Sequence, residues 1–208
     1  SGIAVASSGH PKIDERHEAI GIPFTAGASP VELLTLSDEP GARLRATVVE
    51  FGPVLFSKML NLNDTQSGIV AIAFKYAEEN ALPLLDLKDF RKILQWITGD
   101  GKKEIESDYG RISTASTGAI MRRIVELETQ GAEHFFGETS FDVEDLTRLD
   151  ELGRGMVSIL RLTDVQDKPK LFSTFMLQLL AEVYATFPEE GDMDRPKLVI
   201  FIDEAHLV

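Results

Sequence analysis

The sequence contains no cysteine, no long apolar run and no excess of basic residues. Without cysteine it can form neither a disulfide nor a thiolate metal site, and this composition fits a cytoplasmic protein. No apolar run approaches the roughly 20 residues that span a bilayer, and no basic and apolar leader suggests export. The four histidines are scattered and have no metal-ligand spacing.

The net charge of −13 argues against a surface that coats nucleic acid, because such a field repels phosphate. A local basic loop facing DNA in the channel of a ring stays possible on these grounds. The 208 residues are 43% hydrophobic and 26% charged, which is ordinary globular composition and enough for a substantial core.

The most informative stretch is an apolar run that ends in two acids. Residues 198–202 are all apolar and rich in β-branched side chains, and Asp203 and Glu204 follow directly. Such a run predicts a central parallel strand covered on both faces, with its acids at the edge where α/β sheets bind ligands. This is the form of a Walker B strand, in which Asp203 holds the water shell of Mg²⁺ and Glu204 polarises the water that attacks ATP. The alternative is a strand that simply enters a solvated loop.

The region before this run predicts a βαβ unit. Residues 156–162 form a second apolar run, and Pro169 can occupy the first turn of a helix whose apolar residues face most sides. The two predicted strands would be parallel, and the helix between them would form a right-handed crossover. We therefore expect an α/β fold in three segments: 1–52 with a loop and a β-hairpin, 53–150 as a helical block, and 151–208 as the βαβ unit.

Local signals predict the elements of the first two segments. Residues 31–36 and 43–51 are expected to pair as the hairpin, because a turn-rich pentapeptide joins them; residues 11–19 should form a helical turn or two. In the helical block, Asn63 and Gln66 have capping-box spacing, Asp86 precedes the next helix and Ser116 starts another. The spacing around Asp142 predicts a short helix that starts there.

A P-loop enzyme also needs the run Gly-x-x-x-x-Gly-Lys-Ser/Thr, and this run is absent. The nearest candidate, residues 99–103, follows a helix and lacks the Ser/Thr, so we interpret it as a loop with solvated lysines. Residues 203–206 also spell the DEAH box of superfamily 2 helicases, but the other motifs of those enzymes are missing. His206 either senses the nucleotide or has only a packing role.

Short stretches along nearly the whole chain resemble the bacterial HerA-like (YjgR-type) ATPases of the HerA/FtsK superfamily. The matching stretches are Ser1-Gly2-Ile3, Arg45-Ala46-Thr47-Val48, Leu62-Asn63-Asp64-Thr65-Gln66, Leu84-Leu85-Asp86-Leu87-Lys88-Asp89, Gly118-Ala119-Ile120-Met121-Arg122-Arg123, Phe135-Phe136-Gly137-Glu138, Gly153-Arg154-Gly155, Pro169-Lys170-Leu171 and Asp203-Glu204-Ala205-His206. Each stretch alone is weak, and together they are specific.

The resemblance implies a P-loop (RecA/FtsK-like) ATPase core into which the helical block is inserted. It implies ATP and Mg²⁺ as cofactors, with ATP at the subunit interfaces of a homo-oligomeric ring such as a hexamer. Asp203 would take the metal role and Glu204 the general-base role. The Walker A loop would lie before Ser1, which agrees with a chain that starts without Met and stops after the acids. We therefore expect a piece of a longer protein that is inactive alone. DNA as a substrate is an analogy to the wider superfamily.

Two further features have alternative interpretations. Arg122 and Arg123 are candidates for an arginine finger that reaches a neighbour's γ-phosphate, or they pair with Glu126 and Glu128. The block at 53–150 could instead be a non-catalytic interaction or regulatory module, with incidental acids at the chain end. The aromatic residues Trp96, Phe135 and Phe136 are expected in the core, because no basic residues interleave with them.

Overall fold

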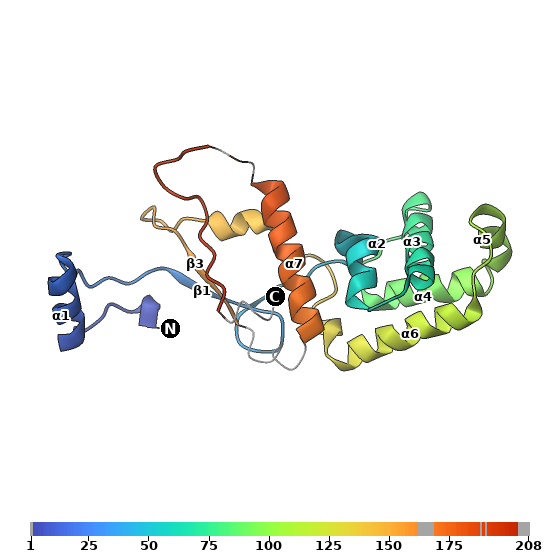
Figure 1. The fold of residues 1–208 in the computed structure, drawn as a ribbon, viewed down its shortest axis with the longest axis horizontal. Coiled ribbons are helices and arrows are strands. Elements are labelled where there is room, and N and C mark those ends of the chain that lie inside the picture. The colour runs from blue at the N-terminus through green and yellow to red at the C-terminus, as the bar shows by residue number, and fades with distance from the viewer. Residues whose placement is uncertain (1, 162–168, 188, 190, 204–208) are drawn as a thin grey trace.

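The computed structural model of this chain describes residues 2–161, 169–187, 189 and 191–203. Figure 1 shows a small sheet near the middle of an elongated molecule, with α7 (Pro169–Thr186) beside it. A helical block made of α2 to α6 extends from one side, and an arm carrying α1 (Pro11–Ile20) extends from the other. None of the described helices combines the length and apolarity that crossing a membrane requires.

The sheet is parallel, which confirms an α/β fold. Its strands are β1 (Val31–Thr35), β2 (Ala42–Arg43) and β3 (Val157–Arg161), in the order β2-β1-β3. The register pairs Thr35 with Arg43 on one side and with Arg161 on the other. All three strands therefore end at the same level of the same edge. In the described part of the chain, the outer edge of β3 has no strand partner.

The predicted hairpin is wrong. β1 pairs with β2 in parallel, and residues 48–51 belong to α2 (Val48–Met59) rather than to a strand. The reason is a capping box: the Thr47 hydroxyl accepts a bond from the Glu50 N–H at 3.2 Å, and the Glu50 carboxylate accepts one from the Thr47 N–H at 2.6 Å. Just before β2 the chain passes close to β1 at Gly41, where a Cβ would lie 2.8 Å from the Leu33 carbonyl oxygen.

The helical block has the predicted helices α3 (Asp64–Glu79), α4 (Leu87–Thr98) and α6 (Thr114–Thr129). It also has a short helix that was not predicted, α5 (Lys102–Asp108). The Asn63 and Gln66 capping box is confirmed, with bonds of 3.0 and 3.2 Å in the two directions. Asp86 caps α4. Helix α6 begins two residues before the predicted start, because the Ser113 hydroxyl accepts a bond from the Ser116 N–H.

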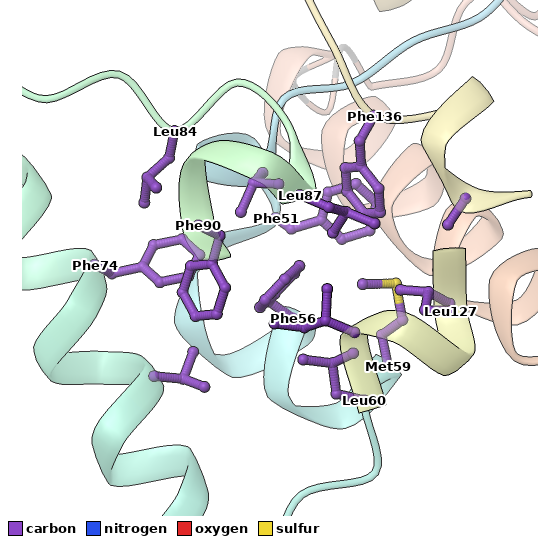
Figure 2. Packing of buried hydrophobic residues seen from close by; sticks show 14 of the residues in the cluster. Phe51, Phe56, Met59, Leu60, Phe74, Leu84, Leu87, Phe90, Leu127 and Phe136 are labelled. Carbon is purple, nitrogen blue, oxygen red and sulfur yellow. The ribbon is translucent and has the colours of Figure 1, made fainter. Parts of the chain in front are cut away.

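An aromatic cluster joins helices α2 and α4 to the segment that follows α6 (Figure 2). Phe56 of α2 lies 4.8 Å from Phe90 of α4, measured between ring centroids, and 6.1 Å from Phe136. Phe135 and Phe136 are buried, as predicted, next to the 3₁₀ helix η2 (Ala132–His134). A second 3₁₀ helix, η3 (Val143–Thr147), starts at the Asp142 cap as expected, and a third, η1 (Gly2–Ala4), lies in the arm.

The burial of α7 differs from the expectation. Phe172, Phe175 and Met176 are buried, but Leu177 is 51% exposed and Tyr184 is 88% exposed. Helix α7 packs on α2 and η3, so these contacts cover one side of it. Apolar residues on the other side of the helix face solvent.

The predicted buried strand over residues 198–202 is not present. The structure has coil there, and Val199, Ile200, Phe201 and Ile202 are all exposed, Phe201 by 91%. Figure 1 draws this segment as a plain trace that returns from the end of α7 towards the sheet. A strand covered on both faces needs ladder partners and covering layers, and the described elements do not place them around this segment.

Candidate functional site at the carboxyl edge of the sheet

The carboxyl edge of the sheet gathers polar side chains from all three strands, and those of the two outer strands are charged. Arg43 is the last residue of β2, Arg161 is the last residue of β3, and Thr35 between them ends β1. Ligands of parallel α/β sheets bind outside this edge, where the loops after the strands meet. We therefore take the ends of β1 and β3, together with the loop after β1, as the candidate site; Arg43 borders it on the far side of β1.

The loop after β1 is held by its own hydroxyl groups. The buried Thr35 Oγ1 accepts a hydrogen bond from the Ser37 N–H at 3.1 Å. The Ser37 Oγ in turn accepts one from the Glu39 N–H at 3.2 Å. This chain of bonds fixes the turn that carries two adjacent acids, Asp38 and Glu39, beyond the sheet edge.

Each of these acids is paired with the arginine of a neighbouring strand. Arg43 donates a hydrogen bond to Asp38, whose side chain is 69% exposed. The imidazole Nε2 of His134 also lies 3.8 Å from Asp38. On the other side, Arg161 Nε lies 3.2 Å from Glu39 Oε2, and the Glu39 side chain is only 13% exposed.

The two pairs differ in how completely they are made. Glu39 Oε2 is buried and has no hydrogen-bond partner in the described part of the chain, so Arg161 neutralises its charge as an ion pair without a proper hydrogen bond. A buried carboxylate oxygen without a donor is costly. The Arg161–Glu39 contact is therefore the less satisfied of the two, although it is the more buried.

The acids singled out in the sequence are only partly described. Asp203 is exposed at the end of the described residues. Glu204 and His206 lie outside the described residues.

The two candidate finger arginines lie in the helical block, on α6 and away from the sheet in Figure 1. Arg123 forms an ion pair with Glu126 at 2.9 Å, as the alternative interpretation expected. Glu128 pairs instead with Arg91 at 3.1 Å. Arg122 is exposed and makes no ion pair with any described residue.

Residues 99–103 were expected to form a loop with solvated lysines; Lys102 and Lys103 are exposed, as expected, but they form the first turn of α5. Gly101 is the N-cap of α5 and packs against Trp96. Trp96 is stacked on Tyr76 with 4.6 Å between the ring centroids. These contacts account for the glycine and the aromatic residue without a ligand.

A cleft of about 240 Å³ lies elsewhere, between α2, α7 and the segment at 135–143. Four of its polar residues are bonded to one another. Glu50 accepts a bond from the Thr139 hydroxyl at 2.7 Å, and the Gln178 amide donates to the Glu50 carbonyl at 3.2 Å and to Glu182 at 2.8 Å. Within the described ranges, no three His, Asp or Glu side chains are grouped to hold a metal. This cleft is a junction between elements.

Sequence reasoning missed Asp38, Glu39, Arg43 and Arg161. A signal was available for one pair, because Arg161 lies in the predicted strand at 156–162 and the two acids follow the predicted strand at 31–36. In a parallel pair these ends meet at one edge. Assigning residues 31–36 to an antiparallel hairpin concealed that relation.

The comparison with protein families identifies the chain. The family model described as Helicase HerA-like C-terminal matches residues 1–208, which is the whole chain, so the protein belongs to this family of HerA-like helicases. The resemblance seen in the short sequence motifs is thereby confirmed. Neither the curated proteins nor the solved structures include a match to this chain.

Proposed function

We propose that this chain is a segment of an ATP-hydrolysing motor of the HerA/FtsK type, a DNA helicase or translocase. The observation that carries the proposal is the match to the HerA-like helicase family along all 208 residues. A parallel sheet with charged side chains at its carboxyl edge supports it, because this is the edge at which α/β ATPases bind their ligand.

The two acids at the end of the apolar run have distinct roles in this proposal. Asp203 would hold the water shell of Mg²⁺, and Glu204 would accept the proton of the attacking water. His206 would lie beside the nucleotide. The chain has no phosphate-cradling run, so we assign that part to polypeptide beyond these 208 residues.

In the complete protein, residues 198–202 would join the sheet as a fourth parallel strand. Two observations support this step: the outer edge of β3 has no strand partner among the described residues, and the four exposed apolar side chains at 199–202 have a composition typical of a buried strand. Burying such side chains contributes about 1.5–3 kcal/mol each when burial is complete. That strand would carry Asp203 to the carboxyl edge.

A ring of such subunits would place ATP between neighbours. Arg122 is the better candidate for a finger that acts in trans, because it is exposed and unpaired within the described chain, whereas Arg123 is held by Glu126. An arginine at a neighbour's γ-phosphate stabilises the charge that develops in the transition state.

Replacing Glu204 by Gln in the full-length protein tests the proposed function. ATP hydrolysis should fall by about a hundredfold or more, because general-base catalysis contributes on that scale, while binding of ATP with Mg²⁺ should persist. Asp192→Asn is the matched control: it removes one exposed acid from the loop after α7 and should leave hydrolysis unchanged. Unchanged hydrolysis in Glu204→Gln would overturn the assignment of the base, and a full-length protein without ATPase activity would overturn the function.

The isolated 208-residue chain should hydrolyse no ATP, and measurable Mg²⁺-dependent hydrolysis by it would contradict the proposal. The second candidate is an interaction module formed by the helical block. Its support is the aromatic core inside residues 53–150, together with the exposed Val54, Leu82 and Val125. A full-length protein that binds a protein partner through residues 53–150 but lacks ATPase activity would favour this module.

A further inference from the structure

We propose that Arg161 contacts a phosphate group of the bound nucleotide, and that Glu39 holds its guanidinium when no nucleotide is present. The inference rests on the proposed function and extends it to a residue pair outside the acidic sequence motif. It starts from the ion pair of 3.2 Å between Arg161 Nε and Glu39 Oε2 at the carboxyl edge of the sheet.

The position of Arg161 is the first argument. It is the last residue of β3, the strand whose outer edge is available to residues 198–202. Adjacent strands lie about 4.8 Å apart, so a strand added there would end within one strand spacing of Arg161. Arg43 ends β2, on the far side of β1, and would be roughly 10 Å further from the added strand. Of the two arginines at this edge, Arg161 is therefore the one beside the proposed acids.

The chemistry of the pair is the second argument. A guanidinium has five N–H donors in a planar fork that matches two oxygens of a phosphate group. In the described part of the chain Arg161 makes one ion pair, through Nε alone, and forms no hydrogen bond with Glu39. A phosphate group would offer the same negative charge together with bidentate hydrogen bonds, so nucleotide binding can displace Glu39 without leaving the guanidinium unpaired.

The Arg43–Asp38 pair is the internal comparison. It comes from the same loop and the same sheet edge, and it also joins an arginine at a strand end to an acid. Its hydrogen bond is made, its acid is mostly exposed, and it lies on the side away from β3. Substitutions at Arg43 therefore change charge and packing in a similar way without removing the proposed phosphate contact.

The test measures binding of a fluorescent ATP analogue and of the corresponding ADP analogue to the full-length protein with Mg²⁺. Arg161→Gln should weaken ATP binding roughly tenfold to a hundredfold, the effect of losing charge-assisted hydrogen bonds. Arg161→Lys keeps the charge but loses the planar fork of the guanidinium. Its affinity for ATP should therefore lie between those of the wild type and Arg161→Gln. Glu39→Gln removes the competing carboxylate and should leave ATP binding as tight as the wild type or tighter. Arg43→Gln should change it by less than about twofold.

The outcomes separate the two proposals. Wild-type ATP binding with an unaffected Arg161→Gln, or equal losses in Arg161→Gln and Arg43→Gln, would overturn the phosphate contact and leave the motor proposal standing. A wild-type protein that binds no nucleotide would overturn both. If Arg161→Gln does not fold, as judged by its circular dichroism and unfolding midpoint, Arg161→Lys and Glu39→Gln decide. Weaker ATP binding in Glu39→Gln than in the wild type would then contradict the displacement of Glu39.

Discussion

A single methyl group at Gly101 should dislodge the tryptophan of this protein. A Cβ at this position would lie 2.1 Å from Trp96 Cζ3 and 2.3 Å from two other atoms of the indole ring. The backbone is not the obstacle, because φ is −81°, outside the left-handed region that favours glycine. The destabilising effect of Gly101→Ala therefore comes from the contact with the ring.

The magnitude follows from what Trp96 must give up. Its ring is stacked on Tyr76 at 4.6 Å and 21°, and such aromatic pairs are worth about 0.5–1.5 kcal/mol beyond their burial. Overpacking a filled site costs about 1–3 kcal/mol. Trp96 is half-buried and can rotate outwards, which relieves part of the strain. We expect a loss of about 2 kcal/mol, which for a chain of this size lowers Tm by about 4–8 °C.

The assay is direct because Trp96 is the only tryptophan. Its emission should shift to the red in Gly101→Ala and become more accessible to a soluble quencher, and the midpoint of thermal unfolding should fall. Gly68→Ala is the control: Gly68 is an exposed residue inside α3 and has nothing within 4 Å of the added methyl group. That change should stabilise the protein by about 0.5–1 kcal/mol. Wild-type emission and an unchanged midpoint in Gly101→Ala would refute the packing argument.

Three smaller changes test other contacts. Asn63→Ala removes the cap of α3 and should cost about 1 kcal/mol in chemical unfolding. A double-mutant cycle on Arg91 and Glu128, which join α4 to α6 by two bonds of 3.1 and 3.2 Å, should give a coupling of about 1 kcal/mol, and zero coupling would contradict the tie. The Tyr109 hydroxyl lowers the pKa of Glu79 by donating to its carboxylate, so this bond contributes above the carboxyl pKa of the unfolded chain and is lost as pH falls through the lower folded value. Tyr109→Phe should raise the pKa of Glu79 in an NMR titration, and an unchanged pKa would argue against the bond.

The helices could be predicted because their signals are local. A helix cap such as Asn63 bonds to a residue only three positions away. An apolar face, such as that of α4, is made of residues one or two turns apart: Phe90, Ile93, Leu94 and Ile97. The structure bears out both. The start of α6 was missed by two residues because Ser113 and Ser116 are both good cap residues, and only the observed bond between them decides which one is the cap.

The strands could be located but their pairing could not be predicted. Residues 31–36 and 156–162 contain β1 and β3, as expected from their apolar content. Their partners depend on contacts between residues more than a hundred positions apart, which no local pattern records. The capping box of Thr47 and Glu50 is visible in the sequence and predicts the start of a helix. It outweighs the nearby β-branched residues, which favour a strand.

The same division between local and distant information applies to the candidate site. The acids at 203 and 204 stand out because an apolar run precedes them, whereas Glu39 lies in a turn and Arg161 ends a strand, and neither has an unusual neighbour in sequence. Only the parallel register, which places Thr35 opposite both Arg43 and Arg161, brings the loop acids and the arginines to one edge. If residues 198–202 complete this sheet beyond β3, Asp203 arrives beside a guanidinium that is already held in place, and the two motifs form one site. If they do not, Arg161 and Glu39 are a partly buried structural pair, and Arg161→Gln should then impair folding stability without changing nucleotide affinity.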